Sequence, residues 1–134
     1  MPTQRQLLTI ASLAECVAGL ALMVAPDAGV TLLLGAEPDA VGLMVGRIAG
    51  VALLALGIAC WGARADSGGA AQTGTLRAMT TYNAGAGLLL IAFVATGKAH
   101  GVAVWTAGIL HLALAAGFAA SLWHLVPAST AQSG

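Results

Sequence analysis

A long apolar stretch at residues 41–64, VGLMVGRIAGVALLALGIACWGAR, constrains the fold of this chain more than any other feature. A helix needs about 20 predominantly apolar residues to cross the hydrocarbon core of a bilayer, and this stretch is long enough. Gly42, Gly46 and Gly50 lie four residues apart and so share one face of the helix. Small residues at this spacing let a second helix approach closely. We therefore expect a membrane-spanning helix over residues 41–63 that packs through its glycine face.

Three further apolar stretches of similar length lie at residues 7–24, 78–96 and 102–125. Charged residues make up 7% of the chain, whereas soluble domains contain roughly 25%. The sequence therefore predicts an all-α integral membrane protein, a single membrane domain over residues 1–134 folded as an antiparallel bundle of four transmembrane helices. The formal net charge is zero and there is no basic block, which argues against nucleic acid as a partner.

The connections between these stretches differ in composition. Residues 27–39 form a predicted loop whose central part, residues 29–35, is apolar, and Asp27 could cap a short helix there. Such a helix would lie flat at the membrane interface or re-enter between the spans, and the sequence leaves both arrangements open. Residues 65–75 are small, polar and glycine-rich, which predicts a flexible link, and we expect a disordered tail over residues 127–134.

Four spans place both termini on the same side of the membrane. Arg5, Arg64 and Arg77 would lie on that side and only Lys98 on the other, which favours an N-in/C-in orientation because positive residues accumulate on the cytoplasmic side. Indole rings prefer the membrane interface, so we expect the tryptophans to act as interface anchors. These are Trp61 and Trp123 on the cytoplasmic side and Trp105 on the outer side.

Four polar side chains interrupt the apolar stretches: Glu15, Arg47, Asn83 and His111. At about 1.5 Å per residue, Glu15 and His111 fall within a few ångströms of the midplane, Arg47 roughly 6 Å toward the outer side and Asn83 roughly 7 Å toward the cytoplasmic side. An arginine side chain is long enough to reach Glu15. We therefore predict a Glu15–Arg47 ion pair inside the bundle, with His111 near it.

These residues allow two interpretations. A buried ion pair and an amide can simply specify which helix lies beside which. Alternatively, ionisable groups within the membrane line a ligand site or a pathway. No second histidine shares the depth and face of His111, and Cys16 and Cys60 lie in separate apolar stretches, so we expect neither a metal site nor a disulfide. We expect Tyr82 to be an interface residue.

A pattern of single residues extends over most of the chain: Glu15, Gly19, Pro26 followed by LLLG, Arg47 and Gly50, Trp61-x-x-Arg64, Tyr82-Asn83, and Trp105 with His111. This pattern resembles that of small four-span bacterial inner-membrane proteins of the DoxX-like kind. The resemblance implies a four-helix membrane bundle, in some cases associated with quinone-linked oxidoreductases. It carries no catalytic residue over to this chain.

We therefore expect a multi-pass protein of the bacterial inner membrane that acts as an accessory or assembly subunit of a membrane complex. Its partners would be the lipid bilayer and other membrane subunits or further copies of itself. The sequence requires no cofactor, although the polar site could hold a quinone or a lipid. The alternative is a small proton-coupled carrier or channel that uses Glu15, Arg47 and His111. We favour a non-enzymatic function because no recognised catalytic spacing occurs.

Overall fold

The computed structural model describes residues 3–125, which form five helices and no strand. Four of these helices are long and apolar enough to cross a membrane: α1 (Gln4–Val24), α3 (Ala40–Ala63), α4 (Ala70–Ala95) and α5 (Val104–Trp123). The fifth, α2, is short and spans Pro26–Leu34. The chain is therefore a helical, multi-pass membrane protein. The tail predicted at residues 127–134 lies outside the described residues.

The connection between α3 and α4 is shorter than the sequence predicts, because α4 begins at Ala70 and not near residue 78. The Asp66 carboxylate accepts hydrogen bonds from the backbone N–H groups of Ala71 (2.9 Å) and Gln72 (3.2 Å). These N–H groups belong to the first turn of α4 and have no partner within the helix, so Asp66 caps it. The buried Gln72 in turn accepts a hydrogen bond from the backbone of Gly68. The residues expected to be a flexible link are therefore partly helical.

The loop predicted at residues 27–39 contains α2. Asp27 lies in the first turn of this helix but does not cap it, because the N-cap residue is Ala25, which makes no side-chain capping bond. Pro26 occupies the first helical position, where its missing N–H costs nothing. Gly35 ends the helix in the left-handed region (φ 79°). Gly46 of α3 packs against Pro26, so α2 folds back against the longer helix.

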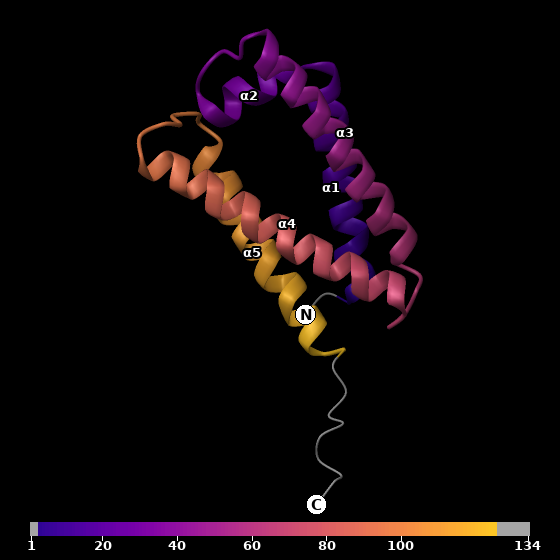
Figure 1. Ribbon diagram of the computed structural model, residues 1–134. Coiled ribbons are helices and arrows are strands. Elements are labelled where there is room, and N and C mark those ends of the chain that lie inside the picture. Colours follow the sequence, from indigo (N-terminus) through magenta and orange to yellow (C-terminus); the bar gives the residue numbers. More distant parts are fainter. Residues whose placement is uncertain (1–2, 126–134) are drawn as a thin grey trace, which may run out of the picture.

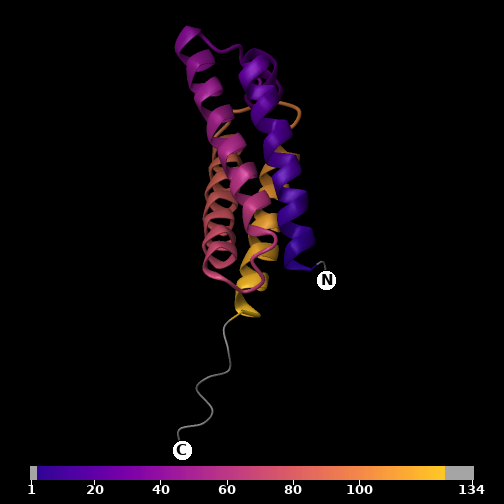
Figure 2. The same ribbon diagram turned by 90° about the vertical axis from the view of Figure 1, so that its right-hand side faces the viewer.

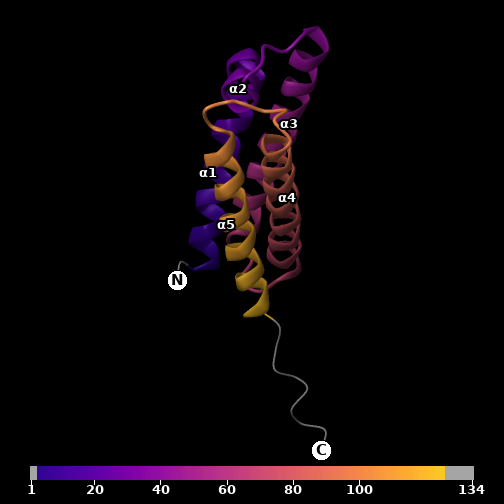
Figure 3. The same cartoon turned by 90° about the vertical axis from the view of Figure 1, so that its left-hand side faces the viewer.

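The long helices are arranged as two pairs. Figures 1 and 2 show α1 beside α3, and Figures 1 and 3 show α4 beside α5. Contacts within each pair are far more extensive than contacts between the pairs. The pairs meet at the end that holds the start of α1 and the end of α5, and they diverge toward the other end (Figure 1).

A hydrophobic core joins all four long helices at the end where the pairs meet. Its buried members are Leu7, Leu8, Ala11, Cys60, Ala63, Leu76, Met79 and Phe118. At the opposite end the pairs are joined through the backbone, because His100 and Ala103 donate hydrogen bonds to the carbonyl oxygens of Leu34 (2.9 Å) and Leu32 (3.2 Å). These carbonyls belong to the last turn of α2 and have no acceptor role within the helix. The two pairs are thus fixed to each other at both ends.

Candidate functional site

Glu15 lies one helical turn beyond the core, because α1 places it four residues after the core residue Ala11. Its side chain is only 7% exposed. Its carboxyl group makes no hydrogen bond or ion pair with any residue in the part of the chain that the structure describes. The carboxyl group is close enough to the Tyr82 hydroxyl and the Cys60 thiol to interact with both electrostatically. A buried carboxyl group therefore lies at the boundary between the two helix pairs.

Asn83 and His111 join the two helices of the second pair. Asn83 is completely buried, and its amide nitrogen donates a hydrogen bond to the carbonyl oxygen of Met79 (2.9 Å). Its oxygen Oδ1 lies 2.8 Å from Nδ1 of His111. Since the amide nitrogen is already used as a donor, Oδ1 must be the acceptor in the second bond, and Nδ1 of His111 carries the proton. In the neutral imidazole this leaves Nε2 as a hydrogen-bond acceptor.

Tyr82 packs between the hydrophobic core and His111, the partner of Asn83. Its ring meets the His111 ring edge to face, with the ring centroids 5.6 Å apart and the planes at 89°. The same residue packs against the hydrophobic core. Tyr82 was expected at the membrane interface, but it is partly buried against the core and the His111 ring. The signal that could have located it is its spacing, three residues after the core residue Met79 and so on the same face of α4.

Arg47 does not belong to this group. Its side chain is exposed, and among residues 3–125 it makes no ion pair with Glu15. Leu56 of the same helix packs against the core, and nine residues at 3.6 per turn place Arg47 about 180° away from it. Arg47 therefore points away from the second helix pair, and the predicted Glu15–Arg47 ion pair is not formed.

The predicted glycine face and the interface anchors can be located in the same way. Gly46 and Gly50 face α2 and α1 respectively, whereas Gly42 lies against Pro38 and the capping residue Asp39 of its own helix. The three tryptophans lie near helix ends and are exposed. Trp61 and Trp123 are at the end where the helix pairs meet and Trp105 is at the other end.

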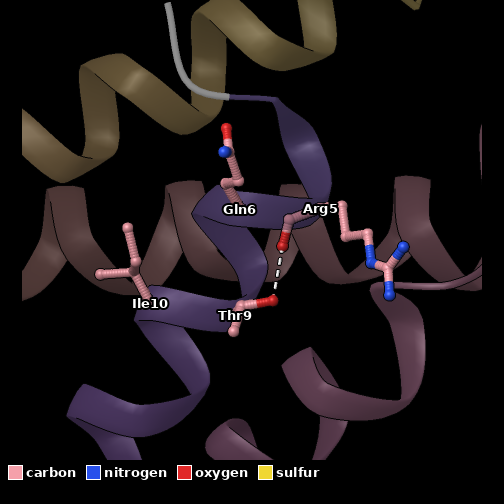
Figure 4. A pocket seen from close by; sticks show the side chains of 4 residues that line it. All are labelled: Arg5, Gln6, Thr9 and Ile10. Carbon is pink, nitrogen blue, oxygen red and sulfur yellow. Dashed lines mark hydrogen bonds between the residues drawn. The ribbon is translucent and has the colours of Figure 1, made fainter.

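Two surface hollows lie away from Glu15. One, of about 410 Å³, is lined by Arg5, Gln6, Thr9 and Ile10 on α1 (Figure 4). The Thr9 hydroxyl in this hollow already donates a hydrogen bond to the Arg5 carbonyl oxygen. A second, of about 380 Å³, lies between the start of α1 and the end of α5. Both are at the end of the molecule near the chain termini, so neither is part of the intramembrane site.

The chemical capacity of the site follows from Glu15, Tyr82, Asn83 and His111, which we call the polar cluster. The cluster contains two groups that can bind a proton near neutral pH in suitable surroundings, a carboxyl and an imidazole. In the part of the chain that the structure describes, no three metal-binding side chains lie close enough together to hold a metal ion. Cys16 and Cys60 are both free thiols. The cluster can therefore form hydrogen bonds and exchange protons.

Comparison with models of known protein families, with curated proteins and with solved structures finds no match for this chain.

Proposed function

We propose that this chain is an accessory subunit of a bacterial inner-membrane complex and that it holds a quinone-like or lipid-like molecule at the polar cluster. The observation that carries the proposal is a pair of ionisable side chains of opposite charge, each without a partner among the described residues. Glu15 is buried at the boundary between the helix pairs, and Arg47 is exposed on the outer face of α3. A small ligand would supply the missing partner of the buried Glu15 carboxyl group, and another protein would supply that of the exposed Arg47 guanidinium group.

The argument for a protein partner rests on the position of Arg47 in the membrane. Arg47 lies about 7 Å from the midpoint of α3, within the hydrocarbon region. An arginine near the centre of a spanning helix costs about 2.5–3.5 kcal/mol unless it is paired or reaches water. A carboxylate on a neighbouring subunit would remove this cost.

The proposed topology is an antiparallel four-span bundle with both termini in the cytoplasm. Arg5, Arg64 and Arg77 belong to the start of α1, the end of α3 and the first part of α4, whereas Lys98 belongs to the opposite connection. The Arg64 guanidinium stacks over the Trp61 ring, 3.3 Å from its centroid, an arrangement suited to the membrane interface. This topology is compatible with the DoxX-like resemblance, which we retain as part of the proposal.

Replacement of Arg47 by methionine tests the subunit function. The complex would be extracted from native membranes in mild detergent and resolved by native gel electrophoresis. If Arg47 pairs with a subunit, Arg47→Met should abolish the band of fixed size, while Arg47→Lys should retain most of it. If Arg47 faces lipid only, methionine suits that position better, and an undiminished complex in Arg47→Met would refute the proposal.

One observation favours a proton-coupled carrier as the second candidate. Glu15 and His111 are both titratable, and the Tyr82 ring meets the His111 ring edge to face. A carrier should move solute in liposomes when purified alone, and His111→Ala should abolish the pH dependence of that flux. The accessory-subunit proposal predicts no flux from the isolated chain.

A further inference from the structure

Asp27 lies at almost the same depth in the membrane as Arg47. A Cβ atom added to Gly46 of α3 would lie 3.1 Å from Cβ of Pro26, so α2 starts beside this part of α3. Arg47 and Asp27 are the next residues in the two helices, and each residue advances a helix by about 1.5 Å. Asp27 therefore lies within the hydrocarbon region, where a carboxylate, like a guanidinium, needs water or a partner of opposite charge.

Both side chains lie on the side of the first helix pair that faces away from the second pair. Arg47 is about 180° around α3 from the core residue Leu56. α2 approaches the second pair with its last turn, where Leu34 accepts a hydrogen bond from the α4–α5 connection (Figure 1). Asp27 is in the first turn, at the opposite end of α2. One outer surface of the first pair therefore carries both charges.

Neither charge has a partner within the described chain. Both side chains are exposed, and among residues 3–125 they form no ion pair with each other or with any other residue. Met44, Val51 and Ile58 are each more than half exposed. With Arg47 they share one face of α3, at the spacing of three and four residues by which one helix packs against another. The surface around the arginine therefore suits a further helix.

We infer that Arg47 pairs with Asp27 of a second copy of this chain, in a dimer whose two-fold axis is perpendicular to the membrane. The inference rests on the proposed function, because it identifies the neighbouring subunit and the carboxylate that Arg47 requires there. Rotation about such an axis leaves each residue at its own depth, and a two-fold contact is reciprocal. Each copy therefore supplies one aspartate and one arginine, and two ion pairs leave neither charge in lipid.

The depth of the carboxylate distinguishes Asp27 from its acidic neighbours. Asp39 is eight residues from Arg47, about 12 Å along α3. Its carboxylate already accepts a hydrogen bond from the backbone N–H of Gly42 (2.7 Å), which caps the helix. Asp27 is both level with Arg47 and unpaired, so a second copy of the chain satisfies both charges at once.

Reversal of the two charges tests the pairing. The purified full chain would carry donor or acceptor fluorophores on a C-terminal tag, and energy transfer in liposomes would measure association. The unaltered chain should dimerise. Asp27→Arg and Arg47→Asp each bring like charges together and should weaken association by at least about tenfold. A mixture of the two single variants should associate within about threefold of the unaltered chain, because both of its contacts again join opposite charges.

A chain with both Asp27→Arg and Arg47→Asp separates this pairing from an ion pair within one chain. It should associate with itself but at least about tenfold more weakly with the unaltered chain, because the mixed contact joins like charges. Ion pairs within each chain would let the two mix freely. Glu37→Arg is the control, a change from acid to base at an exposed residue of the α2–α3 connection, and it should leave association unchanged.

The outcomes separate the inference from the function on which it rests. A monomeric unaltered chain would overturn the inference, and this result does not depend on whether any variant folds. Undiminished association of the single variants, free mixing of the doubly changed and unaltered chains, or no association in either the mixture or the doubly changed chain would also overturn it. If Arg47→Met still abolished the band from native membranes, the accessory-subunit proposal would stand without the dimer.

Discussion

The two helix pairs are held together by different means. In the first pair the backbones of α1 and α3 touch: a Cβ atom added to Gly19 would lie 2.7 Å from the carbonyl oxygen of Gly50, and one added to Gly50 would lie 2.7 Å from that of Gly19. In the second pair the atoms nearest to the glycines belong to side chains, Leu112 at Gly87 and Ile91 at Gly108, and the backbone comes no closer than the Gly108 carbonyl oxygen, 3.1 Å from a Cβ atom on Gly87. A Cβ atom on Gly108 would meet Cδ1 of Ile91, again at 2.7 Å. The distances are equal, but a backbone atom cannot move without its helix, whereas the end of a side chain can.

This difference shows how one small chain can carry both a rigid pair and a polar site. Backbone contact between glycines gives the first pair its association without polar groups. The second pair adds the buried Asn83–His111 hydrogen bond to its side-chain packing. Glu15, on the surface of the first pair, is therefore not needed to hold that pair together. It is available to interact with groups at the boundary.

The largest expected effect concerns the first pair. Gly50→Ala should lower the free energy of unfolding by about 2–3 kcal/mol, because the added methyl group meets backbone atoms of Gly19 and Met23 and forces α1 and α3 apart. The free energy of unfolding can be measured by steric trapping of the purified protein in bicelles.

Gly62→Ala is the control for this experiment. It lies on the same helix, and an added Cβ atom there has no neighbour within 4 Å. Alanine should be neutral at this position or stabilise the helix by up to about 1 kcal/mol. If both variants were equally stable, the backbone contact would not be what holds the first pair.

An intermediate effect is expected from the polar bond of the second pair. Asn83→Ala removes the acceptor of His111 Nδ1–H and should cost about 1–2 kcal/mol, since hydrogen bonds between membrane helices contribute up to about 1.7 kcal/mol and the variant leaves a small space. The ¹⁵N chemical shifts of His111 provide an independent measurement. They should report the Nδ1–H tautomer in the unaltered protein and a shift toward Nε2–H in the variant.

Thr80→Ala distinguishes this bond from a general loss of polarity on α4. Among residues 3–125, the Thr80 hydroxyl donates a hydrogen bond only to the carbonyl oxygen of Leu76 in its own helix. Its removal should leave the His111 tautomer unchanged. An unchanged tautomer in Asn83→Ala would contradict the assignment of the bond.

The sequence was sufficient to predict four apolar helices, because length and composition alone determine which segments can cross a membrane. It was not sufficient to predict that Asn83 lies at the same depth in the membrane as His111. The predicted depth of Asn83 assumed a helix that starts near residue 78. Capping by Asp66 instead extends α4 to Ala70 and moves the midpoint of the helix next to Asn83. The capping bonds form only when the connection folds, and the composition of that connection favours flexibility.

The direction of Arg47 was beyond prediction for another reason. The glycine face predicts one contact surface of α3, which faces α1 and α2, but it does not determine on which side of the first pair the second pair lies. That side is set by Leu56, Cys60 and Ala63, which pack into the shared core. Arg47 lies opposite them, so the same glycine face is compatible with either orientation of the arginine.

The smallest effect is expected at the glycine that receives a side chain. Gly108→Ala should cost less than about 1 kcal/mol, because the added methyl group meets the Cδ1 and Cγ1 atoms of Ile91, which can change rotamer, and otherwise only Leu90 Cβ at an ordinary contact distance of 3.5 Å. The same measurement on Ile91→Val, on Gly108→Ala and on the double variant gives the coupling directly. Shortening Ile91 removes the atom in conflict, so the double variant should be more stable than the sum of the single changes predicts. Additivity of the two changes, together with a loss at Gly108 as large as that at Gly50, would mean that backbone contact holds both pairs, and the distinction between them would not survive.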